Sequence, residues 1–283
     1  MKQQGTLYIV ATPIGNLEDI TLRAVRVLKE VGLIAAEDTR HTRKLLNEYG
    51  IVTPLTSLYD HNEPKKTPFL IAKLRNGTDI AYVSDAGTPG ISDPGYILIN
   101  RAIENDITVT PVPGPSAVVA ALSASGLPMD GFSFWGFLPA RKGKRRHFLE
   151  TLREEKKTMV FYESPQRTIE TLLDIVDTLG DRRAVVAREL SKLYEEILRG
   201  TVSELITMLK DRTVKGEVTL VVAGKEKGDE EFSIESIIAR FEALEHKSSC
   251  STKDIITIIA DDAGISRKEV YRHVLKHLKT RKK

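Results

Sequence analysis

The fold of this chain is decided by the stretch Val83-Ser84-Asp85-Ala86-Gly87-Thr88-Pro89-Gly90-Ile91-Ser92-Asp93-Pro94-Gly95. The apolar run Ile80–Val83 leads into it and is typical of a buried strand. Three glycines and two prolines then rule out a continued strand or helix, and helical apolar spacing resumes at Tyr96. A strand, a loop and a helix in this order place the loop at the carboxyl edge of a parallel sheet, where open α/β folds bind ligands.

The chemistry of this loop limits what it can bind. Its charged residues are Asp85 and Asp93, without any basic residue, so the loop is poorly suited to clamping phosphates. The glycines allow the backbone to approach a ligand closely, and Asp85 can accept hydrogen bonds from hydroxyls or amines. A surface loop without a ligand is equally compatible with the spacing.

Outward from this loop, strands and helices alternate along the whole first half. The pattern predicts a mostly parallel sheet with helices on its faces. It restarts at Gly126-Leu127-Pro128, which indicates a joint between two domains. We therefore expect an N-terminal α/β domain at 1–126, a second α/β domain at 127–225 and a basic helical tail at 233–283 that resembles a helix-turn-helix. The charged segment Lys225–Glu231 reads as the linker to the tail.

The composition is that of an ordinary globular protein. The chain has 283 residues, of which 41% are hydrophobic and 29% are charged. Its single cysteine, Cys250, excludes an internal disulfide and a cysteine-based zinc site. No apolar run reaches the length of a membrane helix, and the N-terminus lacks a signal-peptide pattern. We expect a cytoplasmic protein with no membrane association.

The net charge of +3 is unevenly distributed. Residues 264–283 contain eight Lys or Arg against one acid, and residues 141–157 contain eight against three. Two basic segments on a nearly neutral body favour a polyanionic partner. A solvated helix face and a soluble terminus are the alternative interpretation of each segment taken alone.

Several familiar chemistries have no motif here. The sequence lacks a G-x-G-x-x-G after the first strand, a nucleotide P-loop and a G-x-S-x-G elbow. Its six histidines show no metal-ligand spacing, so no metal is expected. Polar clusters instead follow seven predicted strands, and parallel strands bring such clusters to one edge. These clusters are Thr12–Asn16, Glu37–Thr42, Tyr59–Glu63, Ser84–Gly95, Pro113–Ser116, Glu163–Arg167 and Arg188–Lys192. They predict a ligand held between the two domains, although each is also compatible with a helix cap or a salt bridge.

Six of these motifs together are similar to those of a known family. The segments Gly5–Leu17, Ala36–Arg40, Val83–Gly95, Pro113–Ala117, Phe161–Pro165 and Ala187–Lys192 closely resemble the ribosomal RNA small subunit methyltransferase I family, which belongs to the tetrapyrrole-methylase superfamily. The resemblance covers essentially the whole chain from Gly5. It implies a two-domain, tetrapyrrole-methylase-like (class III methyltransferase) α/β fold with a helical helix-turn-helix appendage.

The resemblance also implies a function. This function is transfer of a methyl group from S-adenosylmethionine to the 2′-hydroxyl of a cytidine, expected at cytidine 1402, in the decoding region of 16S rRNA. The partners implied are the small ribosomal subunit and a second copy of the chain in a homodimer. Carried over by motif, the cofactor-binding residues are Pro13, Ser84, Asp85, Ala86, Gly87, Ile91, Ser116, Ala117, Tyr162 and Ala187.

Methyl transfer to a hydroxyl needs little beyond positioned reactants and a proton acceptor. The hypothesis gives catalytic roles to Glu163, Lys192 and Glu37. Further cleft candidates are Asp38, Glu63 and Glu189. Arg40, Arg167 and Arg188 are interpreted as substrate-binding residues, because guanidinium groups suit phosphate and ribose contacts. A buried network of interdomain ion pairs is the alternative for these residues.

The sequence departs from the family at one place, where Gln166-Arg167 stands instead of the usual His-Arg, so a histidine base is excluded there. Three competing functions remain open at this stage. They are methylation of a tetrapyrrole by the same fold, non-catalytic nucleic-acid binding through the tail, and nucleotide hydrolysis, which the missing phosphate loop disfavours.

Overall fold

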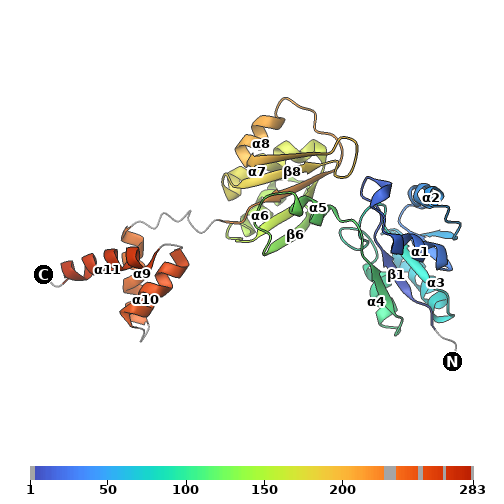
Figure 1. Cartoon of the computed structure of the whole chain (residues 1–283), viewed down its shortest axis with the longest axis horizontal. Helices are drawn as coiled ribbons and strands as arrows, with labels where there is room; N and C mark the ends of the chain where they lie inside the picture. The colour runs from blue at the N-terminus through green and yellow to red at the C-terminus, as the bar shows by residue number, and fades with distance from the viewer. Residues whose placement is uncertain (1–3, 226–233, 248–250, 264–265, 282–283) are drawn as a thin grey trace. The chain divides into compact units, whose positions relative to one another are not determined.

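The computed structural model describes residues 4–225, 234–247, 251–263 and 266–281 (Figure 1). The chain forms two compact units, Met1–Arg153 with Lys157–Ala223 and Glu154–Lys156 with Gly224–Lys283. The first unit contains both sheets, and the second contains the helical tail. Each unit is described separately below.

The first sheet is fully parallel and has the strand order β3-β2-β4-β1-β5. The three central strands β1, β2 and β4 are short apolar runs that are almost wholly buried, whereas the edge strands β3 and β5 are only partly buried and include polar residues. Register pairs Leu7 with Ile80 and with Val109, so the loops after these strands start at the same height. The strands are β1 (Leu7–Val10), β2 (Leu33–Ala36), β3 (Leu55–Ser57), β4 (Ile80–Val83) and β5 (Val109–Val112).

Helices cover both faces of this sheet, and each face has its own core. Thr21 begins one helix by accepting a hydrogen bond from the Ala24 amide at 3.1 Å. The helices are α1 (Leu22–Glu30), α2 (Thr39–Glu48), α3 (Glu63–Arg75) and α4 (Tyr96–Ile103), with a 3₁₀ turn, η1, at Leu17–Asp19. All five carboxyl ends of the strands therefore meet at one edge, as the sequence pattern predicts.

The second sheet is mixed, with the order β6-β7-β10-β8-β9. β6 and β7 pair in parallel, whereas β10 runs antiparallel to both of its neighbours and β9 antiparallel to β8. The carboxyl ends of β7 and β8 thus share an edge with the amino end of β10, where Val218 pairs with Glu163 and Arg188. The strands are β6 (Phe132–Phe137), β7 (Thr158–Glu163), β8 (Arg183–Arg188), β9 (Glu196–Thr201) and β10 (Val218–Val222).

Helices also cover both faces of the second sheet. α5 (Ala117–Ser123) follows the first sheet in sequence but packs its Val118, Ala121 and Leu122 in one core with Val160, Val185, Ala187 and Val221 of the second. The opposite face carries α6 (Lys142–Thr151), a 3₁₀ turn η2 (Pro165–Arg167), α7 (Thr168–Leu179) and α8 (Val202–Leu209). α6 covers the first part of the basic segment 141–157. Its Arg145 is fully buried against Asp174 at 2.7 Å, so this residue is not part of the exposed basic surface.

The two halves of the first unit also touch through their loops. The Asn16 amide donates to the Ser191 hydroxyl at 3.2 Å, and that hydroxyl donates to Asp19. Gly15 lies so close to the 190–192 backbone that an added Cβ would fall 2.8 Å from the Leu190 carbonyl oxygen. These contacts hold the loop after β1 beside the loop after β8.

The second unit is a helical cluster with its own core. The helices are α9 (Ile234–Lys247), α10 (Thr252–Ala263) and α11 (Arg267–Arg281), and Phe241, Ile255, Ile259, Val270 and Val274 are buried between them. The Glu269 amide donates a hydrogen bond to the Ser266 hydroxyl at 3.3 Å, which is one half of a capping box at the start of α11. The predicted linker beyond Lys225 and the Gly264-Ile265 turn lie outside the described residues. The domain boundaries 1–126, 127–225 and 233–283 stay a prediction.

Candidate functional site

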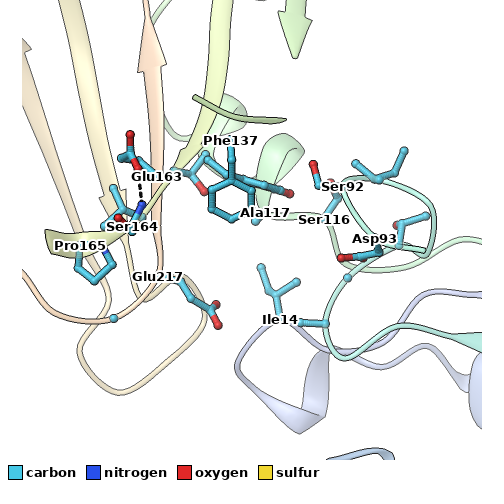
Figure 2. A pocket seen from close by; sticks show the side chains of 18 residues that line it. Ile14, Ser92, Asp93, Ser116, Ala117, Phe137, Glu163, Ser164, Pro165 and Glu217 are labelled. Atoms are coloured by element: carbon cyan, nitrogen blue, oxygen red, sulfur yellow. Dashed lines mark hydrogen bonds between the residues drawn. The ribbon is translucent and has the colours of Figure 1, made fainter. Parts of the chain in front are cut away.

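A cavity of about 330 Å³ in the first unit is lined by loops at one edge of each of the two sheets (Figure 2). This volume is in the range of small-molecule sites. Both halves of the unit contribute residues to it. The lining residues are Ile14, Ala86, Gly87, Thr88, Ile91, Ser92, Asp93, Ser116, Ala117, Phe137, Tyr162, Glu163, Ser164, Pro165, Gly216, Glu217, Val218 and Thr219.

The loop between β4 and α4 forms the wall of the first half. Thr12 and Gly87 exchange backbone hydrogen bonds of 2.8 and 3.0 Å, which tie this loop to the end of β1. Gly95 has φ +125°, and an added Cβ would lie 2.4 Å from the Tyr82 ring. Tyr82 is fully buried, and its hydroxyl donates to the Pro94 carbonyl at 2.7 Å. Glycine is required at 95 because this ring fixes the end of the loop.

Carboxylates gather behind this wall at the ends of β2 and β4. Asp85 accepts a hydrogen bond from the Asp38 amide at 3.0 Å, and Glu37 accepts one from the Asp85 amide at 3.2 Å. Burial, together with the charges of Asp85, Asp60 and Asp38, raises the pKa of Glu37. Asp38 is the exception, because its exposed ion pair with Arg40 holds its pKa well below the usual range.

Asp93 belongs to the same acidic group and lines the cavity directly. Burial first, and then the charges of Glu37, Asp85 and Asp60, raise its pKa to about 6, against a hydrogen bond from Ser84 that lowers it. In Figure 2 its carboxylate points into the space between the two sets of lining residues. No lysine or arginine forms an ion pair with it within the described part of the chain.

Aromatic side chains form the opposite wall. The rings of Phe134 and Phe137 both contact Tyr162, at centroid distances of 4.9 and 5.5 Å. Phe134 and Phe137 are three positions apart, yet both face the same side of β6. They do so because a bulge, with Gly136 at φ +64°, interrupts the strand between them. Burial, then the charges of Asp93 and Glu217, raise the pKa of Tyr162 to about 12. Phe137 keeps 59% of its surface exposed and is available to stack on a ligand.

Ion pairs secure the carboxylates of the second half. Glu163 is enclosed and pairs with Arg167. It also accepts hydrogen bonds from the Thr171 hydroxyl at 2.6 Å and from the Ser164 amide at 2.7 Å. Its oxygens are therefore already engaged, although the residue lines the cavity.

A second group of ion pairs lies on the loop after β8. Lys192 contacts Glu189 at 2.9 Å and Glu217 at 3.2 Å. Burial lowers the pKa of Lys192, but these two carboxylates outweigh it and raise that pKa above its ordinary value. The hydrogen bond from Lys192 lowers the pKa of Glu189. An added Cβ at Gly216 would lie 2.2 Å from the Glu189 carboxylate, so glycine lets the strand β10 begin beside this pair.

Arg188 does not reach the cavity. It binds Glu196 at 2.6 Å, and Arg212 binds the same carboxylate at 2.9 Å. The hydrogen bond from Arg188 lowers the pKa of Glu196. Glu63 is likewise engaged elsewhere, since it is buried and accepts the Leu98 amide at 2.9 Å.

The structure separates the residues predicted from the sequence into three groups. Ala86, Gly87, Ile91, Ser116, Ala117, Tyr162 and Glu163 line the cavity. Pro13, Ser84 and Asp85 line a neighbouring cavity of about 30 Å³. Glu37, Arg40, Ala187, Lys192, Arg167 and Arg188 are in neither lining, and Ala187 is fully buried in the core beneath Tyr162. The cofactor, substrate and catalytic roles given to all of these residues stay predictions.

Sequence reasoning missed three parts of the lining. Asp93 lies in the loop after β4 but was not predicted to be a site residue. Phe137 ends β6 after a bulge, and the sequence indicates that bulge only through Gly136. Residues 216–219 lie at the amino end of β10 instead of after a strand, so a search for strand carboxyl ends cannot find them.

The lining defines the kind of ligand that fits. It combines apolar and aromatic surface with the carboxylates of Asp93, Glu163 and Glu217, and no lysine or arginine is among the described lining residues. Such a lining suits a cation with an apolar or aromatic portion and disfavours a phosphate. Over the described residues, no three His, Cys, Asp or Glu side chains are grouped to hold a metal ion. None of the described helices is long and apolar enough to cross a membrane.

Comparison with known proteins agrees with the geometry. The tetrapyrrole (corrin/porphyrin) methylases match residues 6–206. A ribosomal RNA small subunit methyltransferase I from Halalkalibacterium halodurans is 48% identical over 271 residues, which cover 95% of this chain and 94% of that protein. The protein of the same name from Escherichia coli O157:H7 is 46% identical over 275 residues, covering 96% and 95%.

Solved structures support the fold. A cobalt precorrin-4 methyltransferase superposes with a TM-score of 0.59 at 17% identity, covering 77% of this chain and 94% of that one. A diphthine synthase gives 0.62 at 14% identity, covering 77% and 90%. These likenesses confirm the expected two-domain methylase fold. The chain therefore belongs to the ribosomal RNA small subunit methyltransferase I family, within the tetrapyrrole methylases.

Proposed function

We propose that this chain transfers a methyl group from S-adenosylmethionine to the 2′-hydroxyl of a cytidine ribose in the decoding region of small-subunit 16S rRNA. The observation that carries this proposal is the near full-length identity to proteins named ribosomal RNA small subunit methyltransferase I. The ribose position and the base follow from the sequence motifs that resemble that family.

The cavity supports the choice of cofactor. S-adenosylmethionine carries a sulfonium and an ammonium group beside an adenine ring, and the carboxylates and aromatic rings of the lining match these groups. The cofactor would supply the methyl group as an electrophile. Residues 86–93 and 116–117 would hold it from the first sheet and Tyr162 from the second, leaving Phe137 at the exposed side. Enclosure between the two sheets would hold the cofactor and the ribose in a defined geometry. Such positioning is the main catalytic contribution expected for an in-line displacement.

Exposed basic residues support an RNA substrate. Arg141, Lys142 and Lys144 are exposed and lie at the start of α6, shortly after Phe137 in sequence. In the second unit α11 supplies a further basic helix. Lysine and arginine side chains at such positions bind the phosphate backbone irrespective of sequence. A ribosomal substrate would also account for the cytoplasmic location that the sequence predicts.

Assembly as a homodimer is part of the same proposal and follows from the resemblance. Sedimentation of the purified chain across a concentration series measures it directly. A species of twice the 31.5 kDa chain mass is expected. A monomer at all concentrations would contradict this part of the proposal.

The proposed reaction is tested with small subunits that lack the modification. The protein is incubated with methyl-labelled S-adenosylmethionine and these subunits, and the rRNA is digested to nucleosides for mass spectrometry. Labelled 2′-O-methylcytidine is the expected product. Naked rRNA incubated in parallel shows whether the assembled subunit is required.

Two results would contradict the proposal. Cofactor binding without label in RNA would favour methylation of a tetrapyrrole by the same fold, which a tetrapyrrole substrate then tests. RNA binding that does not depend on the cofactor, without methyl transfer, would favour a non-catalytic binding protein.

A further inference from the structure

Four ionisable side chains line the cavity, and three of them are poorly placed to accept a proton. Glu163 is enclosed by its hydrogen bonds to Arg167, Thr171 and the Ser164 amide. Glu217 is 74% exposed and binds Lys192. Tyr162 keeps its proton, because burial raises its pKa to about 12. No histidine is among the described residues of the lining.

Asp93 differs from the other three in its surroundings. It is half-buried, lines the cavity and has no lysine or arginine partner among the described residues. Three charged groups act on it electrostatically, namely Glu37 after β2, Asp60 after β3 and Asp85 in its own loop after β4. All three are carboxylates, so none neutralises it.

Two tyrosines complete this environment. The Asp93 charge contributes to the raised pKa of both Tyr82 in β4 and Tyr162 in β7, which places the carboxylate electrostatically between the two sheets. The loop itself is held firmly. Ser92 has φ +67°, Gly95 has φ +125°, and the Tyr82 hydroxyl binds the Pro94 carbonyl. A side chain on such a constrained loop is positioned in advance of binding.

We propose that the Asp93 carboxylate accepts the proton of the ribose 2′-hydroxyl during methyl transfer, an inference that rests on the proposed function. The 2′-oxygen forms a bond to the methyl carbon, and the carbon–sulfur bond breaks with its electron pair passing to sulfur. The hydroxyl proton moves to the Asp93 carboxylate. The products are the 2′-O-methyl ribose, a neutral thioether and a protonated Asp93, so atoms and charge balance.

The electrostatics of the loop favour this sequence of events. A cationic ligand beside Asp93 stabilises its ionised form. The positive charge disappears as the methyl group leaves, and the neighbouring carboxylates then favour proton uptake. Asp93 is thus ionised before transfer and a stronger base afterwards. General bases with a pKa near the working pH are the most effective ones.

The test compares Asp93→Asn with the wild-type protein. The rate of methyl transfer to unmodified small subunits is measured in single turnover with both substrates saturating. We expect a loss of about a hundredfold or more, which is the usual contribution of a general base, with the same Tm or a higher one. Asp106→Asn removes one exposed negative charge from the turn between α4 and β5, at a residue with φ +55°, and should keep the wild-type rate.

A second readout does not depend on turnover. Binding of S-adenosylmethionine to the wild-type protein at pH 6 should release protons from Asp93, so the calorimetric heat should vary with the ionisation enthalpy of the buffer. Affinity should rise from pH 5 to 7 and then level off. Asp93→Asn should show neither effect and should bind the cofactor within about tenfold of wild type, the range expected for loss of one charge contact.

The outcomes are distinguishable. If wild type labels RNA and Asp93→Asn transfers methyl within about threefold of its rate, the assignment of Asp93 is wrong and the proposed function stands. Equal proton release by the two proteins would overturn the assignment as well. If wild type itself labels no RNA, the proposed function fails and the inference fails with it.

Discussion

Carboxylates at the edges of the two sheets are in opposite electrostatic states. At the edge of the first sheet, burial and mutual repulsion raise the pKa values of Glu37 and Asp93. At the edge of the second sheet, hydrogen bonds from Lys192 and Arg188 lower those of Glu189 and Glu196. The sequence looks alike in both places, since acidic residues follow a buried strand in each.

This difference separates carboxylates that can react from carboxylates that stabilise the fold. A paired carboxylate contributes stability and is already neutralised, whereas an unpaired one in a cavity costs stability and attracts a cation or a proton. The first sheet's edge therefore supplies reactive groups, and the second sheet's edge supplies a rigid wall. Asp38, which pairs with Arg40, shows that a single cation reverses the state even within the acidic edge.

The largest expected effect on stability comes from breaking the ion pair between Glu163 and Arg167 at the edge of the second sheet. Glu163→Ala leaves Arg167 and Thr171 without their acceptor, and we expect the free energy of unfolding to fall by about 4 kcal/mol. Denaturant titration measures it. Asp177→Ala, which removes a half-exposed pair with Arg146 on the same half, should cost under about 1 kcal/mol. Equal losses for the two variants would show that Glu163 is not a structural residue.

The next effect concerns the fixed end of the first-edge loop. Gly95→Ala forces a methyl group against the Tyr82 ring in a backbone conformation that disfavours side chains, and should cost about 3 kcal/mol. Gly50→Ala is the matched control. Gly50 also has positive φ but open space around its Cα, so it should lose about 1 kcal/mol. Similar losses at both sites would remove the role of Tyr82 in fixing this loop.

Asp93→Asn is expected to change the free energy of unfolding by a smaller amount and to raise it. The folded-state pKa of about 6 lies above the ordinary value, so the folded protein binds more protons than the unfolded one between about pH 4 and 6. Wild-type stability should therefore fall as pH rises through this window, and the variant should escape that loss. After discounting for partial exposure, we expect Asp93→Asn to be on the order of 1–2 kcal/mol more stable at pH 8 and no more stable at pH 4. A variant less stable at pH 8 would contradict the unpaired state of Asp93.

The smallest effect on folding is expected at the surface of the acidic edge. Arg40→Ala removes a side chain that is 90% exposed, so the denaturation midpoint should not move. If Arg40 binds RNA phosphate, the KM for the small subunit should rise by about threefold at low salt and less at high salt. An unchanged KM at low salt would remove Arg40 from the substrate-binding residues.

Much of the first half could be predicted because its signals are local. Short apolar runs, the Thr21 cap and the Gly/Pro-rich loop fix the strands, one helix start and the ligand-facing edge. The second sheet was harder to predict because β10 runs antiparallel. Its amino end brings residues 216–219 to the cavity, and nothing near them in sequence indicates the direction of the strand.

Which carboxylates are paired could not be predicted at all. Glu163 and Asp93 both follow strands in polar clusters, and the difference between them lies in what packs alongside. Arg167 is one turn from Glu163, a spacing that permits a pair without requiring it. Whether Asp93 has a cation nearby depends on its own loop and on the loops after β2 and β3, which are distant in sequence. Local pattern therefore identified the edge of the site, and tertiary contacts decide which of its residues are reactive.

The central proposal is that the cavity between the two sheets is the cofactor site. Ala117 lines it at the start of α5, so Ala117→Leu should fill it, while Val119→Leu changes an exposed position of the same helix. Calorimetric titration with S-adenosylmethionine should show about a hundredfold loss of affinity for Ala117→Leu, equivalent to about 2.7 kcal/mol, and wild-type affinity for Val119→Leu. Wild-type affinity in a folded Ala117→Leu protein would contradict the account.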